Sequence, residues 1–356
     1  MPETKATEQA VRDAFRDQAK SCDGLGSPFT ARLCRLIADR LKSDTPVGAR
    51  VLGWQGDPTS AGDSVALRLC GALHAVVRAG RDDRLQASYP PIQADDETLW
   101  SAVDNAIRRE AAFILDRLQS APQTNEVRRS GALLAGFLTL VDLFGKPLVL
   151  SELGASAGLN LHWDRYRYRL GDTAWGDPAS RVIIEPQWTG PNPPTAKIAV
   201  TDRAGCDLNP LDPASEQDRL RLLSFIWADQ QDRLDRTSFA FETAAARPER
   251  VVRADAIDWL RQRLARSFPG AVHVVYHTIA WQYFPKASQD EGEALIAEAG
   301  RNATMDAPLA RLQMEADGQT PGAALTLEVW PSGEKHLIGR ADFHGRWVEW
   351  TGWPHA

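Results

Sequence analysis

One segment, residues 148–161, constrains the fold of this chain more than any other. It reads L-V-L-S-E-L-G-A-S-A-G-L-N-L, so a short apolar run ends near Glu152, and Gly154 and Gly158 flank a tight turn. Glycine permits positive φ angles and lets the backbone approach a ligand closely. In parallel sheets with helical crossovers, ligands bind beside such turns, outside the carboxyl ends of the strands. The segment therefore predicts a ligand-binding turn in an α/β domain.

The chain changes character where this segment begins. Before residue 147, apolar residues recur at three- and four-residue spacing, which predicts helices over 8–19, 28–41, 65–79, 95–118 and 126–144. After it, strand-like and helical runs alternate, which predicts a mainly parallel sheet with helices on both faces. The last expected strands, 324–330, 335–340 and 346–350, are joined by short turns and predict an antiparallel C-terminal edge. We expect a helical N-terminal cap domain over 1–127 and an α/β domain over 128–356.

The charge, the apolar stretches and the cysteine spacing of the chain limit which binding partners and which cellular location we expect. The formal net charge is −6, whereas proteins that hold nucleic acid through its phosphates are usually basic. The first ten residues carry no apolar signal region, and no apolar stretch approaches the roughly 20 residues that span a bilayer. The four cysteines show no C-x-x-C spacing, and no metal-ligand set stands out. We expect a cytoplasmic protein with a small-molecule partner and without metal, membrane or nucleic acid.

The glycine turn resembles the first motif of class I S-adenosylmethionine-dependent methyltransferases, acid-x-Gly-x-Gly-x-Gly. Glu152, Gly154 and Gly158 match this motif, and Ser156 stands where the middle glycine usually lies. Later segments follow a similar order: a short Val-Val run precedes Asp255, which opens a helix, and residues 272–278 resemble the fourth strand. The resemblance covers roughly residues 128–350 and implies a Rossmann-like fold that binds S-adenosylmethionine.

The resemblance also implies roles for single residues around the cofactor. The turn would surround the methionine and ribose portions through Glu152, Gly154, Ser156 and Gly158, and Asp255 with Ala256 would meet the adenine. An acid after the second strand would bind the ribose hydroxyls. Asp202, after the run 198–201, and Glu185, after the run 182–184, are both candidates, and we favour Asp202.

The acceptor side of the site is expected after the fourth strand. If the acceptor must lose a proton, His277 is the first candidate for the base and Tyr283 the second. Trp281 and Gln282 would hold the acceptor by stacking and hydrogen bonding. Arg128 would cap the pocket or bind the carboxylate of the cofactor. Runs 154–168, 207–212, 277–284 and 344–350 together resemble an uncharacterised bacterial family, which supports the fold and adds no chemistry.

Two other functions remain open. Residues 154–158 also match Gly-x-Ser-x-Gly, the nucleophile elbow of esterases, with Asp255 and His277 following Ser156 in the required order. His336 and His344 are alternative histidines for that enzyme. The helical region before the turn and the absence of a His-Gly-Gly-Gly segment argue against it. The third possibility is a non-catalytic binding module with a methyltransferase-like fold, because a fold does not establish a function.

Overall fold

The computed structural model describes residues 6–354 and divides the chain into two compact units. Unit 1 comprises Met1–Thr124 and Glu216–Asp235, and unit 2 comprises Asn125–Ser215 and Arg236–Ala356. The first boundary lies between Thr124 and Asn125, where the sequence had suggested 127 and 128. The segment Glu216–Asp235, which we had expected in the α/β domain, groups with the helical unit instead. The helical unit is therefore built from two separate stretches of the chain.

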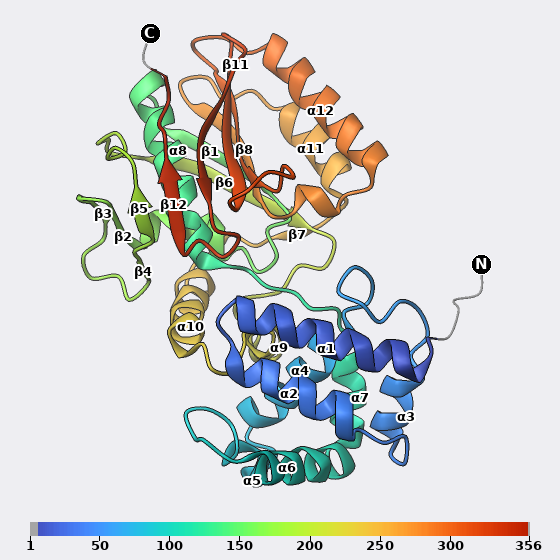
Figure 1. Ribbon diagram of the computed structural model, residues 1–356. Helices are drawn as coiled ribbons and strands as arrows, with labels where there is room; N and C mark the ends of the chain where they lie inside the picture. The colour runs from blue at the N-terminus through green and yellow to red at the C-terminus, as the bar shows by residue number, and fades with distance from the viewer. Residues whose placement is uncertain (1–5, 355–356) are drawn as a thin grey trace. The chain divides into compact units, whose positions relative to one another are not determined.

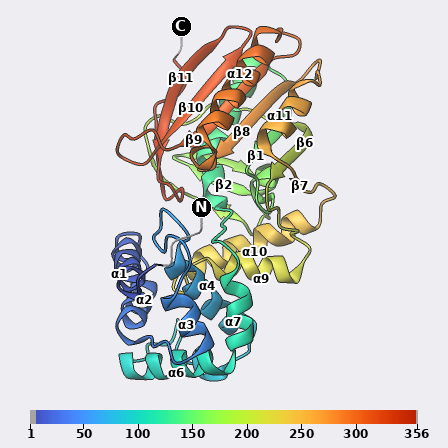
Figure 2. The same cartoon turned by 90° about the vertical axis from the view of Figure 1, so that its right-hand side faces the viewer.

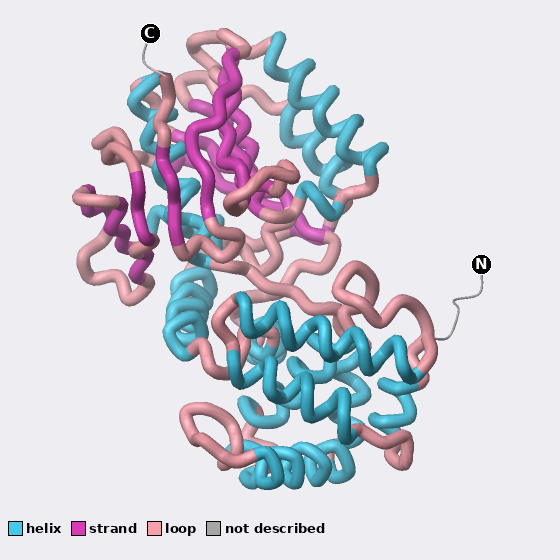
Figure 3. The backbone as a smooth tube through the Cα atoms, viewed as in Figure 1, coloured by secondary structure: helices cyan, strands magenta, loops and turns pink. Residues whose placement is uncertain are grey.

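Unit 1 consists of helices and loops, drawn in cyan and pink in Figure 3. They surround one apolar core. Several of these helices begin with capping residues: the side chain of Thr7 accepts from the N–H of Ala10, and that of Asp95 accepts from the N–H of Thr98. The helices are α1 (Glu8–Gly24), α2 (Pro28–Arg40), α3 (Pro46–Leu52), α4 (Val65–Arg78), α5 (Asp83–Gln86), α6 (Asp96–Arg109), α7 (Ala111–Leu118), α9 (Glu216–Ser224) and the start of α10 (Gln231–Ala245). Among the described residues before Leu148 there is no strand, as expected.

Unit 2 is a mixed α/β unit built on a nine-stranded, mostly parallel sheet of order β5-β12-β11-β10-β9-β8-β1-β6-β7. Five of these strands run parallel in one block, from β7 to β9. They are β1 (Leu148–Leu153), β6 (Val200–Asp207), β7 (Val252–Arg253), β8 (Val272–Thr278) and β9 (Leu309–Glu315). In chain order this block reads 3-2-1-4-5, so the strand order reverses between β1 and β8. Ligands of open parallel sheets bind at such a reversal, outside the carboxyl ends of the strands.

Helices cover both faces of this sheet (Figures 1 and 2). On one face, α8 (Ser130–Phe144) packs on β8 and β9, where Phe137 meets Tyr276 edge-on. On the other, α11 (Ala256–Leu264) and α12 (Lys286–Arg301) share an apolar cluster with Val275 and Leu309. Because successive side chains of a strand point to opposite faces, Val275 and Tyr276 reach different layers. The 3₁₀ turns of unit 2 are η1 (Val127–Arg129), η2 (Leu159–Arg165) and η3 (Trp281–Tyr283).

The remaining strands form an insertion and an edge. Between β1 and β6 lies a small sheet of β2 (Arg167–Leu170), β3 (Thr173–Gly176) and β4 (Ile183–Ile184), followed by the edge strand β5 (Gln187–Thr189). β2 and β3 pair as an antiparallel hairpin, which lengthens the chain between the glycine turn and β6. β10 (Ala323–Trp330), β11 (Glu334–Ala341) and β12 (Trp347–Trp350) confirm the antiparallel C-terminal edge.

One strand, β9, was not expected. Its sequence L-A-R-L-Q-M-E places Arg311 and Glu315 on a buried face, and these charges hide the apolar pattern.

Across residues 6–354, the helices are all too short or too polar to cross a bilayer.

Candidate functional site

The turn after β1 is held in a backbone shape that favours glycine. Gly154 and Gly158 have φ angles of +68° and +71°, and Ser156 between them has +54°. A Cβ on Gly154 would lie 2.7 Å from the Cβ of Ala280, and one on Gly158 would lie 2.9 Å from Val251 Cγ2. Both glycines are therefore required by conformation and by close packing.

A pocket of about 150 Å³ opens beside this turn, at the carboxyl ends of β1, β6 and β7. The residues that line this pocket include Gly154, Asp207, Asp255, Ala256, Tyr283 and Phe284. Larger hollows of about 710 and 370 Å³ lie at the inserted sheet and beside α10, away from these strand ends. The smaller pocket is the candidate site because it alone of the three lies where parallel sheets bind ligands.

Asp207 joins the end of β6 to the glycine turn. Its Oδ2 accepts from the N–H of Ser156 at 2.9 Å, and its Oδ1 accepts from the N–H of Asn209 at 2.8 Å. A carboxylate has about four acceptor positions, so each oxygen retains one for a donor in the pocket. The sequence had suggested no role for this acid, although it belongs to the run 207–212 that resembles the uncharacterised bacterial family.

The two acids that the sequence had suggested for this position lie elsewhere. Asp202 is near the amino end of β6, where Arg263 donates to its Oδ2 at 2.8 Å. Glu185 follows β4 in the inserted sheet, with its Oε1 3.7 Å from Nε of Arg169. Neither lines the pocket. Of these three acids, Asp207 is the one that lines the pocket.

Asp255 and Ala256 lie at the start of α11 and line the pocket. Oδ1 of Asp255 caps the helix by accepting from the N–H groups of Ile257 at 2.8 Å and Asp258 at 3.2 Å. Within the part of the chain that the structure describes, its Oδ2 makes no hydrogen bond. This oxygen is an acceptor available to a ligand.

Glu152 lies one residue before the end of β1 and is only 3% exposed. The hydroxyl of Tyr276 donates to its Oε2 at 3.2 Å. Burial raises the pKa of Glu152 to about 8, although the hydrogen bond from Tyr276 lowers it in part. The side chain is therefore mostly protonated at neutral pH.

His277 does not suit the role of a base acting on a bound acceptor. Its side chain is 0% exposed, its Nδ1 lies 2.7 Å from Oε1 of Glu315, and Nε and Nη2 of Arg311 approach its Nε2 at 3.3 Å. Burial lowers the pKa of His277. The ring is neutral and bound on both nitrogens inside the protein, so it lies out of reach of any molecule in the pocket.

The other acceptor-side candidates separate into two groups. Tyr283 is 74% exposed and lines the pocket, and Gln282 beside it is exposed. Trp281 is buried and stacks on the His277 ring with the ring centres 5.0 Å apart. Arg128, half-buried in η1, is not part of the pocket wall. Only Tyr283 of these residues reaches the pocket.

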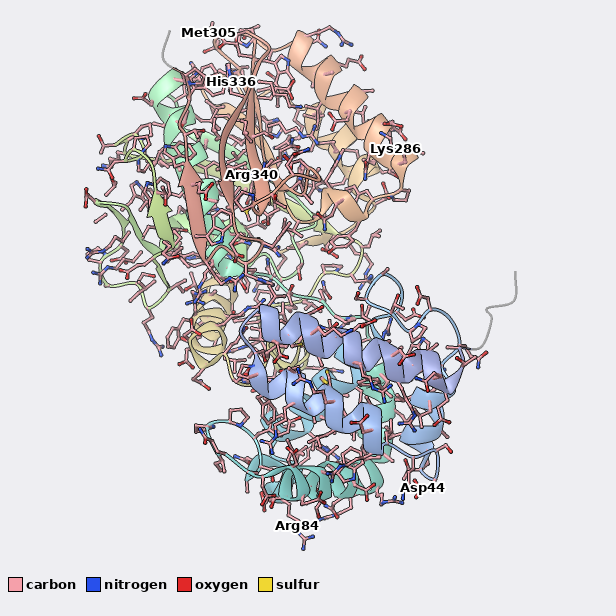
Figure 4. All side chains as sticks on the ribbon, viewed as in Figure 1. Asp44, Arg84, Lys286, Met305, His336 and Arg340 are labelled. Carbon is pink, nitrogen blue, oxygen red and sulfur yellow. The ribbon has the colours of Figure 1, made fainter. Side chains whose placement is uncertain are left out.

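None of the three histidines suggested for an esterase lines the pocket. His277 is enclosed as described. His336 lies near the start of β11 (Figure 4), where its ring packs edge-on against Trp353 and its Nε2 is 3.4 Å from Glu334. The backbone N–H of His344 donates to Asp342 at 3.0 Å in the turn between β11 and β12.

Comparison with known proteins gives a family. The model described as "Uncharacterized protein conserved in bacteria (DUF2332)" matches residues 12–350, nearly the whole chain. The chain belongs to this family. No curated protein and no solved structure matches it.

The pocket of this DUF2332 protein is acidic. The carboxylates of Asp207 and Asp255 line it. Arg253, which precedes the pocket residue Ala254 in the chain, has its Nη1 occupied by the carbonyl oxygen of Leu208 at 2.7 Å and by Oδ1 of Asn209 at 3.1 Å. Over residues 6–354, no three His, Cys, Asp or Glu side chains gather as a metal-binding group. The electrostatic character of the site favours a cationic or hydroxyl-rich ligand over an anionic one.

Proposed function

We propose that unit 2 is a Rossmann-like methyltransferase domain that binds S-adenosylmethionine in this pocket and transfers its methyl group to a small molecule. The observation that carries the proposal is the convergence of Gly154, Asp207 and Asp255 on one pocket. They come from the carboxyl ends of three adjacent parallel strands, next to the reversal of strand order.

Each part of the ligand has matching groups. The free acceptor positions on Asp207 suit the two hydroxyls of a ribose, which are hydrogen-bond donors. Oδ2 of Asp255 suits the exocyclic amino group of adenine, and the ring of Phe284 offers an apolar surface for the base. Gly154, Ser156 and Gly158 would pass close to the methionine portion, with Glu152 behind them.

Two features favour a sulfonium ligand over a dinucleotide. A pyrophosphate binds well at the N-terminus of an α-helix, but here the turn leads into the 3₁₀ segment η2. In addition, the carboxylates of Asp207 and Asp255 would repel a pyrophosphate and attract a positive sulfur centre. The geometry therefore supports an adenosyl ligand that carries positive charge.

Methyl transfer from a sulfonium is an in-line displacement, and the bound cofactor supplies the electrophilic methyl group. The protein contributes mainly alignment of the two partners. A base matters only for acceptors that must lose a proton, and Tyr283 at the pocket rim is the candidate that remains. The esterase and the non-catalytic module are the alternatives that experiment must separate.

Calorimetry tests the proposal with S-adenosylmethionine and S-adenosylhomocysteine on the full-length protein. Both should bind, and Asp207→Asn should weaken binding about tenfold, because hydrogen bonds to charged groups contribute roughly 1.5–3 kcal/mol. Asp202→Asn is the matched control at the opposite end of the same strand and should leave the affinity unchanged.

A parallel challenge with a fluorophosphonate probe tests the esterase. Labelling of the wild type that disappears in Ser156→Ala, without adenosyl binding, would overturn the methyltransferase proposal. Adenosyl binding without methyl transfer to any acceptor in a broad panel would instead favour the binding module.

A further inference from the structure

The loop after β8 forms one side of the proposed adenosyl pocket, and its shape is unusual. Ile279 has a φ angle of +47°, which a β-branched residue rarely adopts. The next residue, Ala280, approaches the backbone of Gly154 so closely that a Cβ there would be 2.7 Å away. Tyr283 and Phe284 then reach the pocket wall. A contact that holds this loop therefore also shapes the pocket.

That contact is made by Glu315, the last residue of β9, which is 8% exposed. Its Oε1 accepts three hydrogen bonds: from Nδ1 of His277 at 2.7 Å, from the N–H of Ala280 at 3.0 Å and from the N–H of Trp281 at 3.1 Å. Burial alone would raise the pKa of Glu315, but these donors hold it below its ordinary value. The side chain is an ionised acceptor for two consecutive amides of the loop.

A second layer holds Glu315 in place. Nε and Nη2 of Arg311, a residue 1% exposed, donate to Nε2 of His277 at 3.3 Å. Since Nε2 accepts, the proton of the neutral imidazole is on Nδ1, where it is donated to Glu315. Nη1 of Arg311 pairs with Glu293 on α12 at 2.6 Å, and its guanidinium lies 4.7 Å from the ring centre of Trp281. The chain of contacts runs from α12 through two strands to the loop.

We propose that Glu315, supported by His277 and Arg311, is the positioning residue that gives the loop Ile279–Phe284 its pocket-forming shape. This inference rests on the proposed function for its link to S-adenosylmethionine. It also gives His277 a role that does not require access to a substrate: the imidazole orients Glu315 and supplies one of its three donors.

Two substitutions of similar size separate position from charge. Glu315→Gln keeps the length of the side chain and an acceptor oxygen, but loses the charge. Glu315→Asp keeps the charge, but is one methylene shorter and cannot span from β9 to both loop amides. If the position of the acceptor oxygen determines the shape of the loop, the Gln variant keeps this shape and the Asp variant loses it. Glu334→Ala, at an exposed carboxylate on β11, is the control.

The first readout needs no ligand: hydrogen–deuterium exchange of peptides covering residues 279–284. We expect Glu315→Asp to raise the exchange rate of this loop at least about tenfold while peptides from α8 stay protected, and Glu315→Gln to stay near the wild type. Unchanged protection in Glu315→Asp would overturn the inference, and so would equal loss of protection across the whole of unit 2.

The second readout is the affinity for S-adenosylmethionine by calorimetry. Glu315→Asp should bind at least about fivefold more weakly than the wild type, and Glu315→Gln should bind nearly as well as the wild type. Wild-type affinity in a Glu315→Asp protein whose loop has lost protection would overturn the link between loop and pocket. If the wild type itself binds no adenosyl ligand, the proposed function fails, and the exchange experiment still decides whether Glu315 positions the loop.

Discussion

Replacing Gly154 with alanine tests the packing of the glycine turn against the loop after β8. The new Cβ would lie 2.7 Å from the Cβ of Ala280, whereas carbon atoms in contact prefer about 3.5–4.0 Å. One of the two segments must therefore move by about 1 Å. Overpacking of this kind costs roughly 1–3 kcal/mol. The positive φ of +68° adds a backbone cost of about 1–2 kcal/mol for a residue with a Cβ.

Gly145 offers a matched control, because the substitution there has only the backbone cost. Its φ is +63°, and a Cβ would meet nothing within 4 Å. The effect of alanine on the unfolded chain is the same at both sites and cancels in the comparison. We expect Gly154→Ala to be less stable than Gly145→Ala by about 1–3 kcal/mol in urea denaturation. It should also bind S-adenosylmethionine more weakly, while Gly145→Ala binds normally. Equal stability of the two variants would refute the close approach of the turn and the loop.

Three further predictions concern Glu152, Asp255 and the second glycine. Because burial raises the pKa of Glu152 from 4.5 to about 8, the folded state binds a proton that the unfolded state has released, so the free energy of unfolding should fall as pH rises from about 4.5 to 8. Glu152→Gln should remove this slope, measured as the wild-type minus variant stability at each pH; parallel curves would contradict it. Asp255→Ser keeps a helix cap but removes the free oxygen, so calorimetry should show weaker adenosyl binding at nearly unchanged stability, and unchanged affinity would remove Asp255 from the site. Gly158→Val should destabilise the protein more than Gly145→Ala, since its Cβ would meet Val251 at 2.9 Å; denaturation curves that coincide would count against this.

The sequence predicted those parts of the fold whose pattern is local. The glycine turn, the helix cap at Asp255 and the apolar run of β8 depend on neighbouring residues, so their signals survive in a single sequence. The N-terminal helices were predicted for the same reason, because each buries one stripe of apolar residues.

The parts that the sequence did not predict depend on distant partners. β6 was expected to end near Val200, yet it runs to Asp207 through Asp202 and Arg203. Those charges are tolerated because Arg263 pairs with Asp202, and Asp164 pairs with Arg203 at 2.6 Å. Because the expected strand ended too early, the sequence suggested Asp202, which does not line the pocket.

β9 was missed for a similar reason. Arg311 and Glu315 read as surface residues, but His277 and Glu293 bind them in the interior. Buried charges of this kind are stable only when they are paired and hydrogen-bonded. Since the partners lie on other strands and helices, a local pattern could not reveal them. The position of His277 at the end of a strand had suggested that its side chain faces a pocket. Its hydrogen bonds with Glu315 and Arg311 instead enclose it in the interior.

The most direct test of the account is a crystal structure grown with S-adenosylhomocysteine. The account predicts the ribose hydroxyls on the carboxylate of Asp207 and the adenine between Asp255 and Phe284. Ligand density elsewhere on unit 2, or a pocket that stays filled by its own side chains at saturating ligand, would contradict it.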